Sequence, residues 1–188
     1  LYNSSRDAIM MLTLEGGFFA GNKSCIKLFG CKDESEFKLQ SPPDLSPEYQ
    51  PDGQLSTVKA REMMEIAMES GSHFFDWAHK ELNGKEFFAS VLLTRVIDNE
   101  NVFLQATVRD ITGQKQMQKS LSASRDRFKL IYENAPIFIY AFDNNGRFIL
   151  WNNQCREVLG WTIDEINAHD DPLALFYPDP AEFNKMTR

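Results

Sequence analysis

A length of 188 residues suits one or two domains, and 43% hydrophobic with 25% charged residues is the composition of an ordinary soluble protein. The formal net charge of −7 argues against a nucleic-acid-binding or anionic-membrane surface, and no apolar run approaches the length that crosses a bilayer. The three cysteines lack metal-ligand spacing and are too few for a disulfide framework. We therefore expect a cytoplasmic segment of a longer protein, without signal peptide, nucleic-acid partner or membrane contact of its own, although another part of that protein can carry a membrane anchor.

The sequence contains a long repeat. Comparison of the chain with itself at an offset of 130 positions, without a gap, aligns apolar and polar positions alike, which indicates two copies of one domain. We divide the chain into copy one (1–112), an amphipathic linker helix (113–134) and the N-terminal half of copy two (135–188). The identical pairs include Tyr2 with Tyr132, Ile9 with Ile139, Gly16 with Gly146, Phe18 with Phe148, Asn22 with Asn152, Cys25 with Cys155 and Gly30 with Gly160.

Each copy opens with a predicted β-hairpin and a short helix. In copy one, the apolar run Ala8–Leu14 is followed by a glycine-containing turn around Gly16 and by a second short strand at Phe18–Ala20. The helix that follows is predicted to begin after an asparagine N-cap and to end at a left-handed glycine. In the two copies these residues are Asn22 and Gly30, and Asn152 and Gly160, with Cys25 and Cys155 as small buried residues inside the helices.

The rest of copy one is predicted to form a loop, a helix and three strands. Four prolines and a glycine make residues 41–54 a surface loop, and a helix at Ser56–Ser70 ends at Gly71. Strands are expected at 72–82, 85–96 and 101–111, the first two joined by a two-residue turn at Asn83-Gly84. Alternation and helical spacing predict these buried faces: Val58, Met64, Ala67 and Met68; Phe87, Ala89, Val91 and Leu93; Val102, Leu104, Ala106 and Val108.

This order of elements predicts an α+β fold, a five-stranded antiparallel sheet with helices packed on one face. The outer face of the last strand is partly polar, as expected where a sheet meets solvent or a partner.

The linker carries a heptad-like apolar seam with a polar residue at its centre. Its spacing fits either a weak coiled coil or a plain amphipathic connector, and the sequence leaves both open. The seam residues are Met117, Leu121, Ser124, Phe128, Ile131 and Ala135.

Together, these segments resemble a PAS domain, the small sensor module of bacterial and archaeal signalling proteins. The resemblance covers copy one, the linker and the first half of copy two. Its motifs, in order, are NSSRDAIMML, GFFAGN, LFG, DLSPEYQPDG, FFDWAHKELNG and VRDIT in copy one, and ENAPIFIYAFDNNGRFILWNN in copy two.

The resemblance implies a sensory role. PAS domains bind a small molecule or cofactor between sheet and helices and pass its state to an output module through the helix that leaves the domain. Asp110 and Thr112 of the closing DIT would fix the start of that helix, although Gly113 stands where the family often has an acidic residue. We expect a cytoplasmic homodimer, through the linker helix or the outer sheet face, in a sensor histidine kinase. The alternatives are a non-sensing interaction module and the sensor of a diguanylate cyclase-type protein.

The sequence does not identify a cofactor, and we expect neither flavin nor haem. Flavin-binding relatives use a reactive cysteine in an Asn-Cys-Arg motif, whereas Gln154-Cys155-Arg156 lies on an earlier helix. The two strand positions where such relatives carry asparagine are His79 and Ala89, counted from a two-residue turn. Haem-binding relatives commonly use a histidine on the long helix, and Ser56–Ser70 has none.

One histidine stands out among the pocket candidates. By strand parity, His79 points inward, either as a polar anchor for a ligand or as a core histidine bound to a backbone carbonyl. Two methionines of the long helix are either pocket lining or core. The candidates are Met64, Met68, Phe75, Trp77, His79, Ala89 and Val91.

Nothing in the sequence indicates catalysis or a metal site. There is no phosphate-binding glycine loop, and His169-Asp170-Asp171 is interpreted as a solvated loop. Because half a sheet cannot bury its apolar face alone, we expect Phe138, Ile139, Tyr140 and Phe148–Trp151 of copy two to be disordered, packed on copy one or paired with another chain.

Overall fold

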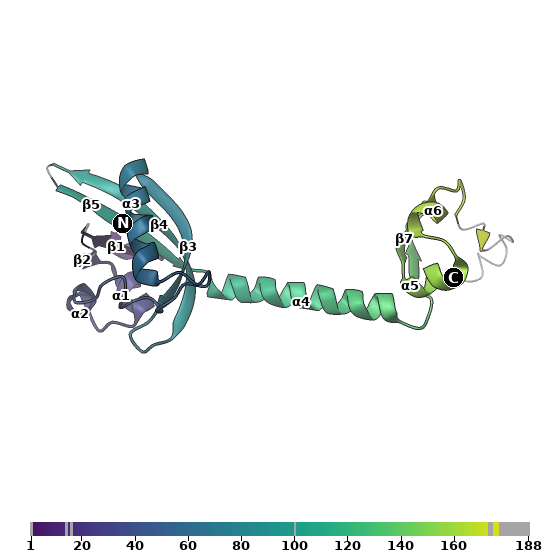
Figure 1. The fold of residues 1–188 in the computed structure, drawn as a ribbon, viewed down its shortest axis with the longest axis horizontal. Coiled ribbons are helices and arrows are strands. Elements are labelled where there is room, and N and C mark those ends of the chain that lie inside the picture. Colours follow the sequence, from purple (N-terminus) through teal and green to yellow (C-terminus); the bar gives the residue numbers. More distant parts are fainter. Residues whose placement is uncertain (1, 14, 16, 100, 173–174, 177–188) are drawn as a thin grey trace. The chain divides into compact units, whose positions relative to one another are not determined.

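The structure is a computed structural model that describes residues 2–13, 15, 17–99, 101–172, 175 and 176. The chain divides into two compact units, Leu1–Gln118 and Lys119–Arg188 (Figure 1). Three sequence-based predictions fall outside the described residues: the strand end at Leu14, the turn residue Gly16, and the last part of copy two at 177–188.

The first unit is an antiparallel sheet covered by helices, which confirms the predicted α+β fold. After a 3-10 turn (Tyr2–Ser4), the strands are β1 (Ala8–Leu12), β2 (Phe18–Gly21), β3 (Ser72–Lys80), β4 (Glu86–Asp98) and β5 (Asn101–Asp110). Their order in the sheet is β2-β1-β5-β4-β3, and every pair is antiparallel. The helices are α1 (Lys23–Phe29), α2 (Glu34–Lys38) and α3 (Ser56–Ser70) (Figure 1).

Strand alternation predicted most of the core correctly. The expected inward face of β4 is buried throughout, and so are Leu104, Ala106 and Val108 of β5. The prediction that Val102 is buried is wrong, because 41% of its surface is exposed. Val102 pairs with Ile97, itself exposed, near the turn that joins β4 to β5, where neither side chain reaches the core.

The buried stripe of α3 differs from the predicted one. Met63 and Ala67 are buried, whereas Val58 is 64% exposed. The observed stripe, Ser56, Ala60, Met63 and Ala67, recurs every three or four residues and leaves Val58 on the outer side. Met64 and Met68 pack against the core and remain partly exposed.

The turn between β3 and β4 is longer than predicted. Lys80 pairs with Glu86, and the Glu81 N–H donates to the Lys85 carbonyl at 2.8 Å, so the loop is the three residues Leu82–Gly84. Gly84 is left-handed, with φ 89°, as three-residue hairpin loops require. His79 therefore lies opposite Phe87, and Ala89 opposite Trp77.

Copy two repeats the first elements of copy one, a β-hairpin followed by two short helices. It contains β6 (Tyr140–Phe142), β7 (Phe148–Trp151), α5 (Asn153–Leu159) and α6 (Ile163–Asn167). Phe148 and Trp151 are buried with Cys155 and Ile166 in a cluster inside copy two. For these two residues, the prediction of disorder, or of packing on copy one or on another chain, is therefore wrong. The two short helices close over the hairpin, while the predicted interaction residues Phe138, Tyr140 and Ile149 remain exposed.

The two copies fill one place in the core in different ways. In copy one, Phe18 packs on Phe37 with ring centroids 4.7 Å apart, and a side chain at Gly21 would come within 2.8 Å of Phe37. In copy two, Phe148 packs on Trp151 at 4.9 Å. Trp151 takes the repeat position of Gly21. Ile166 takes the place of Phe37, because each is the fourth residue after its helix N-cap (Thr162 and Asp33) and each is fully buried. The aromatic partner has moved from the helix to the strand.

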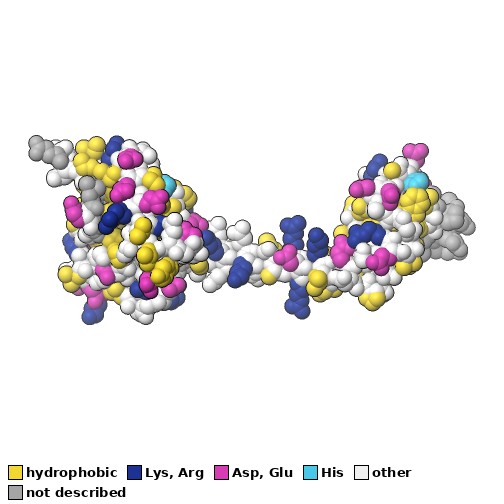
Figure 2. Space-filling view, in the orientation of Figure 1, with side chains coloured by type: hydrophobic (Ala, Val, Ile, Leu, Met, Phe, Trp, Pro, Cys, Tyr) yellow, Lys and Arg dark blue, Asp and Glu magenta, His cyan; other side chains and the backbone are white. Residues whose placement is uncertain are grey.

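The linker is one helix, α4 (Thr112–Asn134), and it has no buried residues. Hydrophobic side chains reach its surface among Lys and Arg side chains (Figure 2). No helix among the described residues is long and apolar enough to span a membrane.

Candidate functional site

Copy one holds a cavity between its sheet and its helices. The cavity measures about 60 Å³, and its wall is almost wholly apolar. It is lined by Met10, Leu12, Phe18, Phe29, Pro42, Leu45, Ser46, Ala60, Met64, Phe75, Trp77, His79, Val91, Leu93, Ala106 and Val108.

Five of the seven pocket candidates line this cavity: Met64, Phe75, Trp77, His79 and Val91. Met68 lies instead in an open groove beside it, and Ala89 is buried without lining either. Pocket residues of β1 and β2 were not proposed from the sequence, although the alternation of Met10 and Leu12 is a usable signal.

The loop at 41–54 forms one wall of the cavity, which its composition did not predict. Leu45, Ser46 and Gln50 are buried. The Trp77 Nε1–H donates to Ser46 Oγ at 3.0 Å. The Gln50 amide accepts from the Ala78 N–H at 2.9 Å and donates to the Ala78 carbonyl at 3.1 Å. These bonds attach the loop to β3, so the wall is fixed by strand contacts.

His79 lines the cavity and binds this wall through one of its two ring nitrogens. Its Nδ1 lies 3.1 Å from the Leu45 carbonyl, which can only accept, so Nδ1 carries the proton. Nε2 is buried and has no hydrogen-bond partner in the structure. Burial lowers the pKa of His79 to about 4, against a smaller opposing effect of the Leu45 bond. The ring is therefore neutral at physiological pH, packed edge-on against Phe29 and stacked on Phe87.

The start of α4 is attached to the opposite face of the same strands. Asp110 Oδ1 accepts the Thr112 N–H at 2.8 Å, which satisfies a free donor of the first helical turn. The Thr112 hydroxyl bonds Phe88 of β4 instead of capping its own helix. Lys115 forms an ion pair with Asp76 of β3 at 2.8 Å and lies 5.1 Å from the centre of the Phe88 ring.

The cavity and the helix start therefore share strands. Asp76, which holds Lys115, lies between the cavity residues Phe75 and Trp77. Phe88, which holds Thr112, lies one residue beyond Phe87, the ring that stacks on His79. Because neighbouring residues of a strand point to opposite faces, β3 and β4 each place an inward-facing residue beside one that contacts the start of α4.

Two family models match the chain. One, described as a PAS domain, covers residues 6–113, and the other, described as the PAS fold, covers residues 126–187. The chain belongs to the PAS domain family. Its arrangement is a tandem of PAS copies, as the repeat predicted.

Solved PAS structures share the fold at low identity. A PAS domain of a protein from Colwellia psychrerythraea gives a TM-score of 0.51 at 18% identity, over 60% of this chain and 92% of that chain. An RNA-binding light-oxygen-voltage receptor gives 0.52 at 14% identity, over 66% of this chain and 35% of that chain. A PAS domain from a two-component sensor histidine kinase gives a TM-score of 0.47 at 17% identity, over 57% of this chain and 87% of that chain. No curated protein matches the chain.

Each PAS copy contains a buried asparagine that makes the same set of hydrogen bonds. In the first, Asn22 Oδ1 accepts the N–H groups of Ile9 and Cys25, and its Nδ2 donates to the carbonyls of Tyr2 and Asp7. In the second, Asn152 makes the equivalent bonds, with Ile139, Cys155, Tyr132 and Ile137 as partners. Both asparagines are thus more than the N-caps that the sequence predicted.

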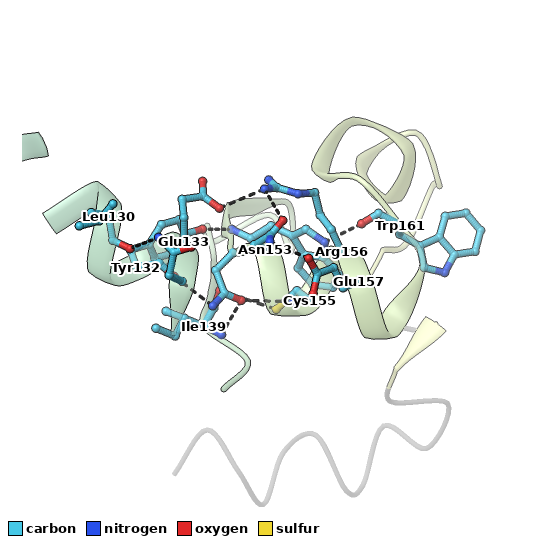
Figure 3. A network of polar contacts seen from close by, with 12 residues as sticks. Leu130, Tyr132, Glu133, Ile139, Asn153, Cys155, Arg156, Glu157 and Trp161 are labelled. Carbon is cyan, nitrogen blue, oxygen red and sulfur yellow. Dashed lines mark hydrogen bonds and ion pairs between the residues drawn. The ribbon is translucent and has the colours of Figure 1, made fainter. Parts of the chain in front are cut away.

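In the second PAS copy this network binds the end of α4 (Figure 3). Asn152 donates to the Tyr132 carbonyl at 3.1 Å, and the Tyr132 hydroxyl accepts the Trp151 N–H. Arg156 of α5 pairs with Glu133 at 3.1 Å. The helix that leaves the first PAS copy is therefore hydrogen-bonded to the hairpin and helix of the second.

The described part of the chain holds no group of three or more His, Cys, Asp or Glu side chains arranged to bind a metal ion. His169-Asp170-Asp171 lies in an exposed segment after α6.

Proposed function

We propose that this segment is a sensory PAS module, in which a small ligand in the cavity of copy one alters β3 and β4, and α4 carries the change to copy two and to a downstream output domain. The observation that carries the proposal is the alternation on β3, where Asp76 binds the helix and its two neighbours line the cavity. The segment itself is non-catalytic in this proposal and works in the cytoplasm.

Hydrogen exchange tests the coupling in the complete 188-residue chain. Ala106→Val adds volume at the cavity wall, and Ala20→Val is the matched control, an alanine of another strand outside the cavity. We expect the cavity substitution, and not the control, to change amide exchange at Thr112–Gln118. A change confined to the cavity strands would refute the relay.

The output domain that fits a relay of this kind best is a histidine kinase. The assay uses the full-length protein with ATP and looks for acid-labile phosphate on histidine. Formation of a cyclic dinucleotide from GTP would assign the sensor to a diguanylate cyclase-type protein instead.

Dimerisation through α4 is a second candidate function, favoured by its exposed apolar seam. Met117, Leu121, Phe128 and Ile131 are each at least 60% exposed, and a solvent-exposed seam of this spacing is what two parallel helices bury between them. A homodimer through this seam is compatible with sensing, and the outer sheet face is the other surface available for it.

A further inference from the structure

The cavity of copy one has one polar atom without a partner. Of its lining residues, Ser46, Trp77 and His79 have polar side-chain atoms. Ser46 Oγ accepts the Trp77 N–H and donates to the Pro42 carbonyl at 2.7 Å. His79 Nδ1 is bound to Leu45, which leaves Nε2 as the unpaired group.

Water does not fit this environment well. A buried water molecule needs two to four polar partners, and apolar cavities with fewer remain dry and accept apolar molecules instead. A molecule with a single polar group and an apolar remainder matches the wall better. Its polar group can hydrogen-bond to the unpaired nitrogen, and its apolar part can pack against the apolar side chains. An unpaired buried acceptor costs about 1–3 kcal/mol, or roughly 5- to 150-fold in affinity, which such a molecule recovers.

The protonation state of His79 determines whether the polar group of the ligand must donate or accept a hydrogen bond. Because Nδ1 donates to a carbonyl, Nε2 carries a lone pair and can only accept. A ligand must therefore supply an O–H or N–H. The surrounding side chains are apolar, so a charged ligand would lose its hydration without compensation.

An open groove on the surface adjoins the cavity and indicates where a ligand would enter it. This open groove, between α3 and residues 41–43, shares Pro42, Ala60 and Met64 with the cavity wall. Met68 lines the groove farther out. A flexible thioether at the shared boundary can change rotamer without breaking a hydrogen bond.

We propose that the cavity binds a small, uncharged, largely apolar molecule with one hydroxyl or N–H group, which donates a hydrogen bond to His79 Nε2, and that this molecule enters beside Met64. The inference rests on the sensory function proposed above and defines its ligand class. The cavity volume limits the ligand to a molecule of a few heavy atoms.

The test compares two probes of nearly the same shape, 2-propanol and acetone, of which only 2-propanol can donate. The complete chain is labelled with ¹⁵N, and titrations follow the His79 Nε2 resonance and the amides of Val91, Leu93 and Ala106. We expect 2-propanol to shift these resonances and to bind at least about 5-fold more tightly than acetone. Equal affinities, or shifts confined to the protein surface, would overturn the proposal.

Two variants separate the hydrogen bond from the cavity. In His79→Phe, the flat ring is kept and the acceptor is lost, so the preference for 2-propanol over acetone should disappear. In Ala106→Val, both probes should bind more weakly. If His79→Phe does not fold, the Nε2 shift of the wild-type chain decides alone. A retained preference in a folded His79→Phe would refute the role of His79.

The same samples distinguish this inference from the relay. Tight 2-propanol binding without a change in exchange at Thr112–Gln118 would leave the ligand class standing and refute the relay. A response of those amides to acetone as strong as to 2-propanol would refute the ligand class and leave the relay standing.

Discussion

The Thr112 hydroxyl binds both backbone groups of Phe88, accepting its N–H at 2.9 Å and donating to its carbonyl at 3.3 Å. The Ile111 N–H also donates to the Phe88 carbonyl, at 2.8 Å. The first residue of α4 and the residue before it are thereby bonded to β4, the strand next to the edge strand β3. In the relay proposed above, these bonds are the point at which a shift of β4 would reach the helix.

Loss of the Asp110 carboxylate should loosen this start without unfolding copy one. Asp110→Ala removes the acceptor of the Thr112 N–H, and amide exchange at Thr112 and Gly113 should rise, while the exposed position limits the stability loss to about 1 kcal/mol. Asp110→Asn retains a side-chain oxygen and is the matched control. A large fall in the melting temperature of copy one for Asp110→Ala would show that the residue is mainly structural.

Thr112 should act through its hydroxyl alone. Thr112→Val keeps the branched shape and removes both bonds to Phe88, so coupling between cavity substitutions and α4 exchange should weaken. Thr112→Ser keeps the hydroxyl and should preserve the coupling. The prediction fails if valine and serine behave alike.

Stability should fall in acid because of His79. Its pKa is about 4 in the folded chain and 6.5 in the reference state, so between these values the unfolded chain binds a proton that the folded chain does not. The free energy of unfolding should therefore decrease as pH falls from 6.5 to 4, by up to about 3 kcal/mol. Urea denaturation at several pH values gives the free energy of unfolding of wild type and His79→Phe. The difference between the two proteins in how this free energy changes with pH measures the contribution of His79. Parallel curves would contradict it.

The asparagine networks predict equivalent damage in the two copies. Asn152→Ala leaves the buried N–H group of Cys155 and the partly buried N–H group of Ile139 without their acceptor, at a cost of about 2–3 kcal/mol. It should also free the end of α4 and change the fluorescence of Trp151. Asn22→Ala is the counterpart in copy one and should affect Trp77 instead. If either substitution unfolded both copies, the prediction that each asparagine stabilises only its own copy would be wrong.

The seam of α4 should dimerise the chain. Leu121→Glu places a charge in the seam, whereas Leu130→Glu places the same charge on an equally exposed leucine outside it, at 71% and 66% exposure. Sedimentation equilibrium should show weakened association only for the first variant. Equal effects, or a monomeric wild type at all concentrations, would exclude a seam dimer.

Local signals were predictable from sequence, and long-range ones were not. The caps at Asn22 and Gly30 follow from neighbouring residues and were found correctly. Asn83-Gly84 fits two-residue and three-residue loops equally well, so the register of β3 and β4 was displaced. Adjacent methionines at 63 and 64 left the phase of α3 ambiguous.

The cavity illustrates the same limit. Strand parity predicts that Phe75, Trp77 and His79 point inward, and in the structure all three line the cavity. The contribution of Leu45 depends on bonds to β3, more than thirty residues farther along the chain, which no local pattern encodes.

The bonds between the 41–54 loop and β3 have a consequence for self-association. β3 is an outer strand of the sheet, and outer strands invite β-augmentation by other chains. Gln50 occupies both backbone groups of Ala78, and the Leu45 carbonyl accepts the Lys80 N–H at 2.9 Å. The C-terminal half of this strand is therefore closed to sheet extension and to aggregation by strand addition.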